Sequence, residues 1–262
     1  MQSERLIIDR LRESDRADYF ENISHDKKVL ETFVCTYAER LEDFDFSGYL
    51  SNESLFAIRL KQTGGLIGII LYFDEKDGAC EIGYGIGSSH WGKGYGTEAV
   101  LRFLSWCFEE RGLQRVYASF FTGNDASRRI MEKCGMSYHH FSEKEMSYLG
   151  AERDLTYYVI QRSEWGQLAL AEAEKAIRPG RYRHFKGREY EVIGIARHSE
   201  TEAPLVVYRK CYDDGGLWVR PAEMWNETVS RTARPCPASG GSRRPENSIQ
   251  SGEPRPCGGA PR

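Results

Sequence analysis

The glycines between residues 83 and 96 are the first feature of this sequence that could bind a ligand. The stretch reads Gly-Tyr-Gly-Ile-Gly-Ser-Ser-His-Trp-Gly-Lys-Gly-Tyr-Gly; a strand pattern ends at Ile86, and a helix pattern follows the last glycine. Because glycine has no side chain, a ligand can approach the backbone closely, and the first N–H groups of the helix lack partners within it. These groups and the helix dipole favour an anion such as a pyrophosphate. Lys93 and Thr97 add a cation and a hydroxyl.

Three kinds of phosphate ligand compete for this loop. A P-loop requires serine or threonine after its lysine, but Gly94 follows Lys93. The stretch from Gly94 to Ala99 fits a loose dinucleotide pattern, yet the next strand, 115–121, has no acidic residue for a ribose, and the strands before the loop form a hairpin. The third candidate is coenzyme A, with its pyrophosphate on the turn and its pantetheine arm along the preceding strand.

The elements that position the loop are predicted from hydrophobic periodicity and from glycine turns. We expect strands at residues 5–11, 54–60, 66–73, 79–86, 115–121 and 155–160. We expect helices at residues 14–23 and 37–50, from the loop to Gly112, and at residues 126–134. Gly64 and Gly65 form a hairpin turn, so an antiparallel meander leads into the loop. The fold class is therefore α/β, in the broader sense α+β.

Composition divides the 262 residues into four parts. We predict one large domain at residues 1–165, a helical connector at 166–178, a small β-rich domain at 179–230 and a disordered tail at 231–262. The tail holds six of the nine prolines and no aromatic residue, so it cannot bury enough apolar surface to fold.

The whole-chain composition excludes several classes of protein. The formal charge of −3 gives no electrostatic reason to expect nucleic acid as a partner. The longest apolar run, residues 66–73, is too short to span a bilayer, and the N-terminus has no secretory signal. The seven cysteines form no C-x-x-C pair, which argues against a zinc site or a disulfide scaffold. We therefore expect a cytoplasmic protein with no metal and no membrane segment.

Three motifs in the first 165 residues resemble the GNAT acetyltransferase superfamily. Trp91-Gly-Lys-Gly-Tyr-Gly96 matches the signature [QR]-x-x-G-x-[GA], except that tryptophan stands in the first position. Residues 124–136, Asn-Asp-Ala-Ser-Arg-Arg-Ile-Met-Glu-Lys-Cys-Gly-Met, resemble the downstream N-x-x-[AS]…E-K-x-G-F element. Residues 157–165 resemble the end of the ribosomal-protein N-acetyltransferase (RimJ/RimL-like) branch.

This resemblance implies a GNAT fold, with a central mixed and mostly antiparallel sheet flanked by helices, and acetyl-CoA as co-substrate. It also implies that the backbone of Ile86 contacts the pantetheine arm and that Asn124 lies near that arm. The residues that it assigns to the pyrophosphate are Trp91, Gly92, Lys93, Gly94, Tyr95, Gly96 and Thr97.

Acetyl transfer to an amine needs a base for the amine and a proton for the departing thiolate. Glu81 is a candidate base acting through water; the alternative interpretation is a solvated charge at a strand end. His139 is a second candidate, since it stands where RimL-like enzymes often carry a glutamate; the alternative is an exposed loop histidine. Ser127 matches a serine of that branch and is the candidate proton donor; the alternative is a serine that only satisfies backbone at a helix start. Met131, at the position of a tyrosine in many GNAT enzymes, has no proton to give.

The resemblance, together with these candidate residues, implies an N-acetyltransferase that moves acetyl from acetyl-CoA to a primary amine. A protein N-terminal α-amine is the first choice of acceptor, and a polyamine or antibiotic amine is the alternative. An alternative of another class is a non-catalytic protein that senses acyl-CoA. The stretch from Gly180 to Pro221 resembles a small bacterial family of unknown function, so it predicts a boundary and no activity. The oligomeric state does not follow from the sequence.

Overall fold

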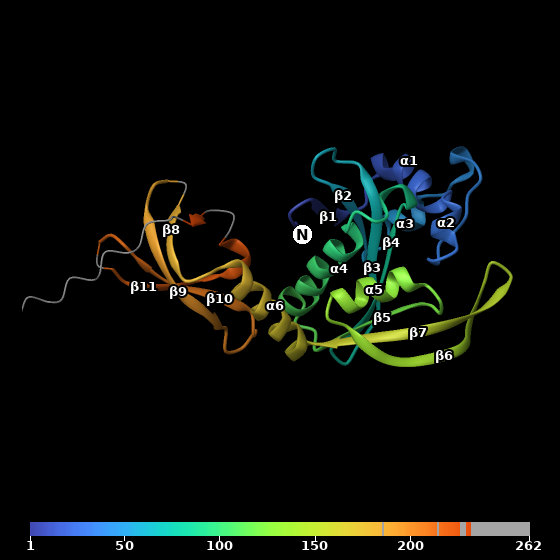
Figure 1. Ribbon diagram of the computed structural model, residues 1–262. Coiled ribbons are helices and arrows are strands. Elements are labelled where there is room, and N and C mark those ends of the chain that lie inside the picture. The colour runs from blue at the N-terminus through green and yellow to red at the C-terminus, as the bar shows by residue number, and fades with distance from the viewer. Residues whose placement is uncertain (185, 214, 226–228, 232–262) are drawn as a thin grey trace, which may run out of the picture. The chain divides into compact units, whose positions relative to one another are not determined.

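Figure 1 shows the computed structural model of the chain, which describes residues 1–184, 186–213, 215–225 and 229–231. These residues form two compact units. One contains residues 1–177 and 195–205, and the other contains residues 178–194 and the described residues from 206 onward. The disordered tail predicted at 231–262 lies, apart from Arg231, outside the described residues.

The elements follow in chain order. The strands are β1 (Leu6–Arg10), β2 (Leu55–Leu60), β3 (Leu66–Lys76), β4 (Ala79–Ile86), β5 (Arg115–Phe121), β6 (Ser137–Tyr148), β7 (Ala151–Gln161), β8 (Gly180–His184), β9 (Glu189–Arg197), β10 (Pro204–Lys210), β11 (Leu217–Pro221) and β12 (Val229–Arg231). The helices are α1 (Arg16–Tyr19), α2 (Lys27–Leu30), α3 (Ser47–Leu50), α4 (Tyr95–Ser105), α5 (Asp125–Lys133) and α6 (Arg162–Ala176).

The first seven strands form one mixed sheet in the order β1-β2-β3-β4-β5-β7-β6. β4 and β5 run parallel, and all the other neighbouring pairs of this sheet run antiparallel. Parallel neighbours need a crossover connection, and α4 provides it between β4 and β5 (Figure 1). The prediction of a mixed, mostly antiparallel sheet flanked by helices is confirmed.

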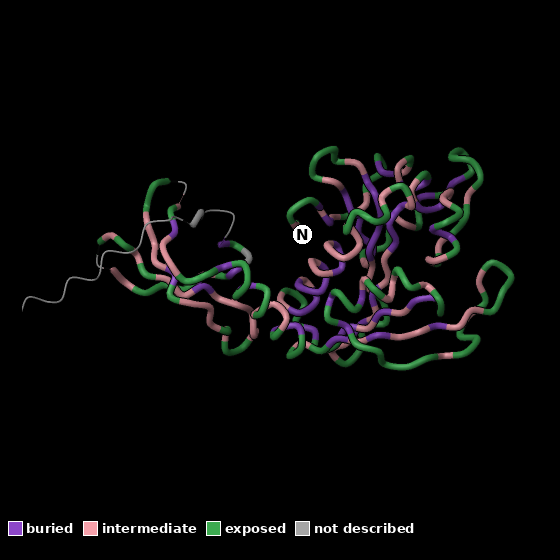
Figure 2. The backbone as a smooth tube through the Cα atoms, in the orientation of Figure 1, coloured by how far each residue is buried: buried purple, intermediate pink, exposed green. Residues whose placement is uncertain are grey.

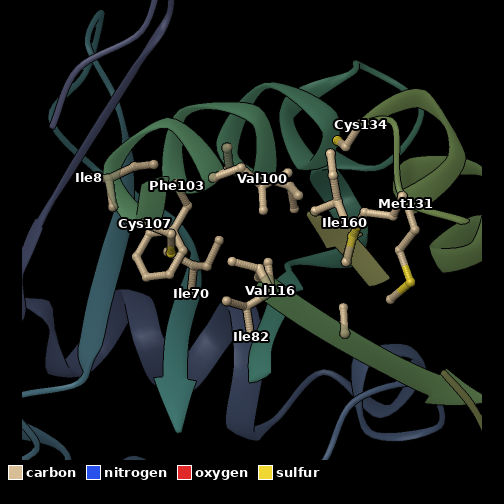
Figure 3. Packing of buried hydrophobic residues seen from close by; sticks show 14 of the residues in the cluster. Ile8, Ile70, Ile82, Val100, Phe103, Cys107, Val116, Met131, Cys134 and Ile160 are labelled. Atoms are coloured by element: carbon tan, nitrogen blue, oxygen red, sulfur yellow. The ribbon is translucent and has the colours of Figure 1, made fainter. Parts of the chain in front are cut away.

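Alternate strand residues pack into two apolar cores on opposite faces of this sheet. In β2, Phe56 and Ile58 belong to the core that α4 covers, whereas Leu55 and Ala57 belong to the core that includes residues of α1 and α2. Figure 3 shows the first core, where Phe103 of α4 lies among strand side chains. The buried backbone in Figure 2 follows the sheet and α4, while β6 is mostly exposed.

Residues 37–50 do not form the predicted helix. They form a loop with a 3-10 turn at Leu41–Asp43 and the single turn of α3. Phe44 and Phe46 are buried while the residue between them is exposed, a spacing that suits an extended chain rather than a helix. Both rings pack on Tyr19, with centroids 5.7 and 5.3 Å away, so tertiary burial overrides the local preference.

The small sheet, in the order β11-β10-β9-β8-β12, confirms the predicted β-rich second domain. Trp225 is 1% exposed, and its ring centroid lies 5.0 to 6.4 Å from those of Tyr182, Tyr190 and Tyr208. These aromatic side chains therefore form the core of the unit. Trp218, by contrast, is half exposed.

Candidate active site

The site begins where β4 and β5 separate. They pair only from Ala79 to Ile82 and from Arg115 to Ala118; beyond these residues β4 stays paired with β3, and β5 with β7. Two cavities open along this separation. Four residues line both cavities and define their junction: Thr32, Phe33, Tyr84 and Ser127.

The first cavity, of about 440 Å³, is called the loop cavity because the glycine loop lines it together with the end of β4 and part of α5. Gly92 and Gly94 have φ angles of +74° and +82°, which favour glycine, and Gly94 is the N-cap of α4. A Cβ atom at Gly96 would lie 2.8 Å from Cδ1 of Ile130, so this glycine lets α4 and α5 approach closely. The first turn of α4 thus lines the cavity with backbone groups.

A network from the N-terminus of the chain holds the loop. Glu98, in the first turn of α4, accepts hydrogen bonds at 2.7 Å from Ser3 Oγ, from Arg5 N and from Arg5 Nε. The Arg5 guanidinium also donates to the carbonyl oxygen of Lys93 at 3.0 Å. These bonds and the charge of Arg5 hold the pKa of Glu98 below its usual value, against the effect of burial. The anionic Glu98 at a helix N-terminus also interacts favourably with the helix dipole.

The cations of the loop cavity come from α5 rather than from the loop. Arg129 and Lys133 line it, and their spacing of four residues puts them on one face of the helix. Lys93, the cation expected from the sequence, donates its Nζ to the carbonyl oxygen of Ser89 at 3.0 Å and is not among the lining residues.

Trp91, in the first position of the loop signature, is bonded to the end of β4. Its indole Nε1 donates to the carbonyl oxygen of Ile86 at 2.6 Å. The N–H of Gly87 points toward β3, where it donates to the carbonyl oxygen of Ile67 at 2.9 Å. Because backbone groups alternate in direction along a strand, the N–H of Ile86 points the other way, into the separation between β4 and β5. The N–H of Ile86 is therefore directed to the loop cavity, where it can donate to a ligand, while the carbonyl oxygen of Ile86 accepts the bond from Trp91.

Asn124 and Ser127 are joined at the start of α5. The Asn124 side chain accepts from the Ser127 N–H at 3.2 Å and donates from Nδ2 to Ser127 Oγ at 3.0 Å. Because this oxygen accepts, the Ser127 hydroxyl keeps its own proton for another partner. Tyr84 donates from its hydroxyl to the Ser127 carbonyl oxygen at 3.3 Å, and burial raises the pKa of this phenol. Met131 is buried in the core and lines neither cavity (Figure 3).

The second cavity, of about 470 Å³, is called the acidic cavity because Asp74, Glu81 and Glu145 line it. Its aromatic walls are Phe33, Phe73, Tyr84, Phe120, Phe121 and Tyr157. Glu81 accepts a hydrogen bond from Ser119 Oγ at 2.5 Å. Burial raises the pKa of Glu81, and the charges of Asp74 and Glu145 act in the same direction, against the Ser119 bond and the charge of a nearby histidine. A carboxylate with a raised pKa is suited to accept a proton near neutral pH.

His139 lies outside both cavities. It is exposed on β6, with its Nδ1 2.6 Å from Nδ1 of His140 and its ring edge-on to Tyr117. It lines a third hollow, of about 310 Å³, to which Glu81 also contributes. Of the three side chains expected to move protons, the structure brings Glu81 and Ser127 to the two connected cavities and leaves His139 in the adjoining hollow.

Four residues that line the cavities were not predicted from the sequence: Phe33, Tyr84, Arg129 and Lys133. The two cations had a signal, because they are four residues apart on a helix whose first residues were already expected near the coenzyme. Tyr84 stands between two glycines of the strand before the loop, and this pattern could have indicated that its side chain borders a ligand cavity. No local sequence pattern indicated that Phe33 belongs to the site, since it comes from a loop far earlier in the chain.

A family model described as an acetyltransferase (GNAT) domain matches residues 5–137. The chain belongs to the GNAT acetyltransferase family. It is an acetyl-CoA-dependent N-acetyltransferase, as members of this family are. Residues 180–243 match a separate family, described only as a protein of unknown function (DUF1653).

Two proteins of Bacillus subtilis that are named as N-acetyltransferases resemble part of the chain. An uncharacterized N-acetyltransferase of Bacillus subtilis, YoaA, is 26% identical over 179 residues, covering 61% of this chain and 95% of the relative. A putative ribosomal N-acetyltransferase of the same species, YdaF, is 33% identical over 104 residues, covering 39% of this chain and 57% of the relative.

Solved structures agree with the fold. An acetyltransferase of the GNAT family from Bacillus anthracis has a TM-score of 0.54 and 25% identity, covering 62% of this chain and 97% of its own. A spermidine N-acetyltransferase from Vibrio cholerae, solved with CoA and spermine, has a TM-score of 0.54 and covers 62% of this chain and 99% of its own. At 18% identity this second likeness concerns the fold alone.

Among the residues that the structure describes, none of the helices is both long enough and apolar enough to cross a membrane. Nor do the described residues contain a group of three or more His, Cys, Asp or Glu side chains placed to hold a metal ion.

Proposed function

We propose that this N-acetyltransferase binds acetyl-CoA in the loop cavity and acetylates a primary amine that enters through the acidic cavity. The observation that carries the proposal is the junction, where Tyr84 and Ser127 line both cavities. The loop cavity offers backbone N–H groups and two cations, which suit an anionic coenzyme. The acidic cavity offers three carboxylates, which suit a cationic acceptor.

The coenzyme would be held mainly by backbone. We assign its pyrophosphate to the loop at residues 91–97, where the N–H groups of the first turn of α4 have no partner within the helix. Arg129 and Lys133 add positive charge on the facing helix. The N–H of Ile86 is directed toward the arm of the coenzyme or the acyl oxygen, and Asn124 lines the same cavity.

Bound acetyl-CoA supplies an activated thioester carbonyl, and the residues of the chain would manage the protons around it. An amine attacks only in its neutral form, so the incoming ammonium must lose a proton. Glu81 would accept that proton, directly or through water. The Ile86 N–H would stabilise negative charge on the acyl oxygen. Ser127 would give its hydroxyl proton to the departing thiolate and take up, in the same step, the proton that the newly bonded nitrogen loses as the amide forms.

Gly94→Val should weaken acetyl-CoA binding by at least about tenfold, as measured by calorimetry. At a φ of +82° a branched side chain is strained, and its Cβ would lie 3.4 Å from the Arg5 guanidinium that supports the loop. The side chain would also intrude where a phosphate has to touch the backbone.

Gly112→Val is the matched control. Gly112 has a similar φ of +72°, but a Cβ there meets nothing within 4 Å, and it lines neither cavity. Both variants carry about the same backbone strain, 1–2 kcal/mol. Unchanged acetyl-CoA affinity in a folded Gly94→Val protein, or an equal loss in Gly112→Val, would contradict the assignment of the loop.

The acidic cavity favours a small acceptor with a second positive charge, such as a polyamine. Its carboxylates would attract both ammonium groups, and its aromatic walls would cover the carbon chain between them. A protein N-terminal α-amine is the second candidate. The similarity to a relative named a putative ribosomal N-acetyltransferase favours it.

The release of free coenzyme A thiol across a panel of amines tests this proposal. We expect kcat/KM for 1,4-diaminobutane to exceed that for butylamine by at least about tenfold, which corresponds to about 1.4 kcal/mol of extra attraction. Equal values for the two amines would refute the cationic acceptor, and a peptide with a free N-terminus as the best substrate would establish the second candidate. No thiol release with any amine would contradict acetyl transfer itself.

We further propose that residues 1–165 are the acetyltransferase domain and 179–230 a separate domain joined by the segment 166–178. The two family matches, at 5–137 and 180–243, support this division because they do not overlap. α6 lies within the first unit, where Trp165 belongs to the large core.

A further inference from the structure

Phe33 covers the junction of the two cavities. Its ring lies directly against the backbone of β4: a Cβ added at Gly85 would be 3.1 Å from Cδ1 of Phe33, and one added at Gly83 would be 3.7 Å from its Cε2. The two glycines therefore leave a space that the ring occupies. Because Phe33 lines both cavities, its position decides how much room the reacting groups have.

The segment that carries Phe33 is held by one residue from far along the chain. The Tyr148 hydroxyl lies 3.1 Å from the carbonyl oxygens of Phe33 and of Cys35, and it accepts the Cys35 N–H at 3.3 Å. A phenol has a single proton, so Tyr148 shares it between the two carbonyl groups while its oxygen accepts the amide. Three backbone groups of this segment thus meet on one hydroxyl.

Tyr148 itself is oriented by the wall of the acidic cavity. Its ring stacks on Phe121, with centroids 5.7 Å apart and an interplanar angle of 29°, and Phe121 lines that cavity. Phe33 and Cys35 are partly buried against the core that includes residues of α1 and α2, whereas Val34 between them is 46% exposed. The Tyr148 hydrogen bonds therefore add to a partial apolar packing of this segment.

We propose that Tyr148 is a positioning residue that holds Phe33 over the junction and thereby sets the affinity for the acceptor amine. Tyr148 lines neither cavity, so it acts through the backbone of residues 33–35. The effect of Tyr148 on acceptor affinity rests on the proposed function. The effect of Tyr148 on the backbone of residues 33–35 does not depend on any substrate.

Tyr148→Phe keeps the stacked ring and removes only the hydroxyl. We expect KM for 1,4-diaminobutane to rise by about threefold to tenfold, the range for loss of one net hydrogen bond. The acetyl-CoA dissociation constant should change by less than about twofold, because the glycine loop and α5 are untouched. Tyr138→Phe is the control: this tyrosine is on the same strand, is 60% exposed and lines neither cavity.

Amide hydrogen exchange provides a readout without substrate. In Tyr148→Phe the peptide covering residues 33–35 should exchange faster, and in Tyr138→Phe it should exchange as in the unaltered protein. Unchanged exchange of this peptide in Tyr148→Phe would overturn the proposal that Tyr148 holds residues 33–35. Faster exchange with an unchanged KM would overturn the effect on the acceptor. An unaltered enzyme that acetylates no amine would instead contradict the proposed function.

Gly85→Ala supplies a second variant in case Tyr148→Phe is poorly folded. Its Cβ presses on the Phe33 ring from β4, so KM for 1,4-diaminobutane should rise. When Gly85→Ala is combined with Tyr148→Phe, residues 33–35 are no longer held by Tyr148, so the Phe33 ring can move away from the methyl group introduced at residue 85. The combined effect should therefore be smaller than the product of the two single effects, and a simple product would count against the coupling of Tyr148 to Phe33.

Discussion

Arg59→Met should lower the free energy of unfolding by about 3–5 kcal/mol in urea titrations, the usual cost of leaving one partner of a buried ion pair alone. The Arg59 and Asp15 side chains are each 5% exposed, and two guanidinium nitrogens of Arg59 lie 2.5 and 2.6 Å from the Asp15 carboxylate oxygens. Arg59 Nε also donates to Asp9 at 2.7 Å. Methionine keeps most of the volume, so the loss would report the stranded carboxylate rather than a cavity.

Arg12→Met is the control for this pair. Arg12 also contacts Asp9, but its side chain is 62% exposed, so the change should cost no more than about 1 kcal/mol. If the two variants lost equal stability, burial would not be the reason that the Arg59 pair matters.

The pH dependence of this effect has a defined sign. Burial alone would raise the pKa of Asp15, but the hydrogen bonds and the charge of Arg59 hold it below its usual value. A carboxyl with a lowered folded-state pKa contributes stability above its unfolded pKa, about 3.9, and loses it as the pH falls through the folded value. The stability gap between the wild type and Arg59→Met should therefore be full at pH 7 and should narrow as the pH falls, because protonation of Asp15 removes the charge that the variant leaves unpaired.

The strand–loop–helix from residue 79 to 105 could be predicted because each signal is local. Apolar residues fill β4, the glycines break the pattern, and the buried face of α4 repeats at helical spacing through Val100, Phe103 and Leu104. No distant residue was needed to recognise these elements. The anion-binding character of the loop follows from the same local features.

β6 shows where local patterns fail. Its residues, Ser137–Tyr148, read Ser-Tyr-His-His-Phe-Ser-Glu-Lys-Glu-Met-Ser-Tyr, and most of them are exposed. With so little apolar alternation, only the backbone ladder to β7 defines this strand. The residues of β6 therefore gave no signal for a strand, and nothing local placed Tyr148 beside residues 33–35.

The acidic cavity was beyond prediction for a related reason. Asp74, Glu81 and Glu145 come from three different strands, and each taken alone looks like a solvated charge. Only the separation of β4 from β5, together with the pairing of β5 with β7 and β7 with β6, brings them around one space. Glu81 was named from its strand position, but its raised pKa depends on burial and on those two distant carboxylates.

Ser127→Ala should lower kcat by up to about 100-fold with little change in KM, measured as thiol release from acetyl-CoA with a saturating amine. Ser127 lines both cavities, and its oxygen accepts a bond from Asn124, so its proton is free to reach a departing thiolate. The substitution leaves the backbone N–H of residue 127 bonded to the Asn124 side chain, so the start of α5 should persist. The loss would then report the hydroxyl rather than an unravelled helix.

Two comparisons decide whether the proton comes from Ser127. Met131→Leu conserves volume in the core, where Met131 is 1% exposed, and should cost little in kcat or KM. Tyr84→Phe removes the other hydroxyl at the junction, which also carries a proton and is therefore the rival donor. At equal stability, we expect Ser127→Ala to impair turnover most. A larger loss in Tyr84→Phe would transfer the role to the phenol, and a larger loss in Met131→Leu would show that packing of α5, rather than a proton from this helix, limits the reaction.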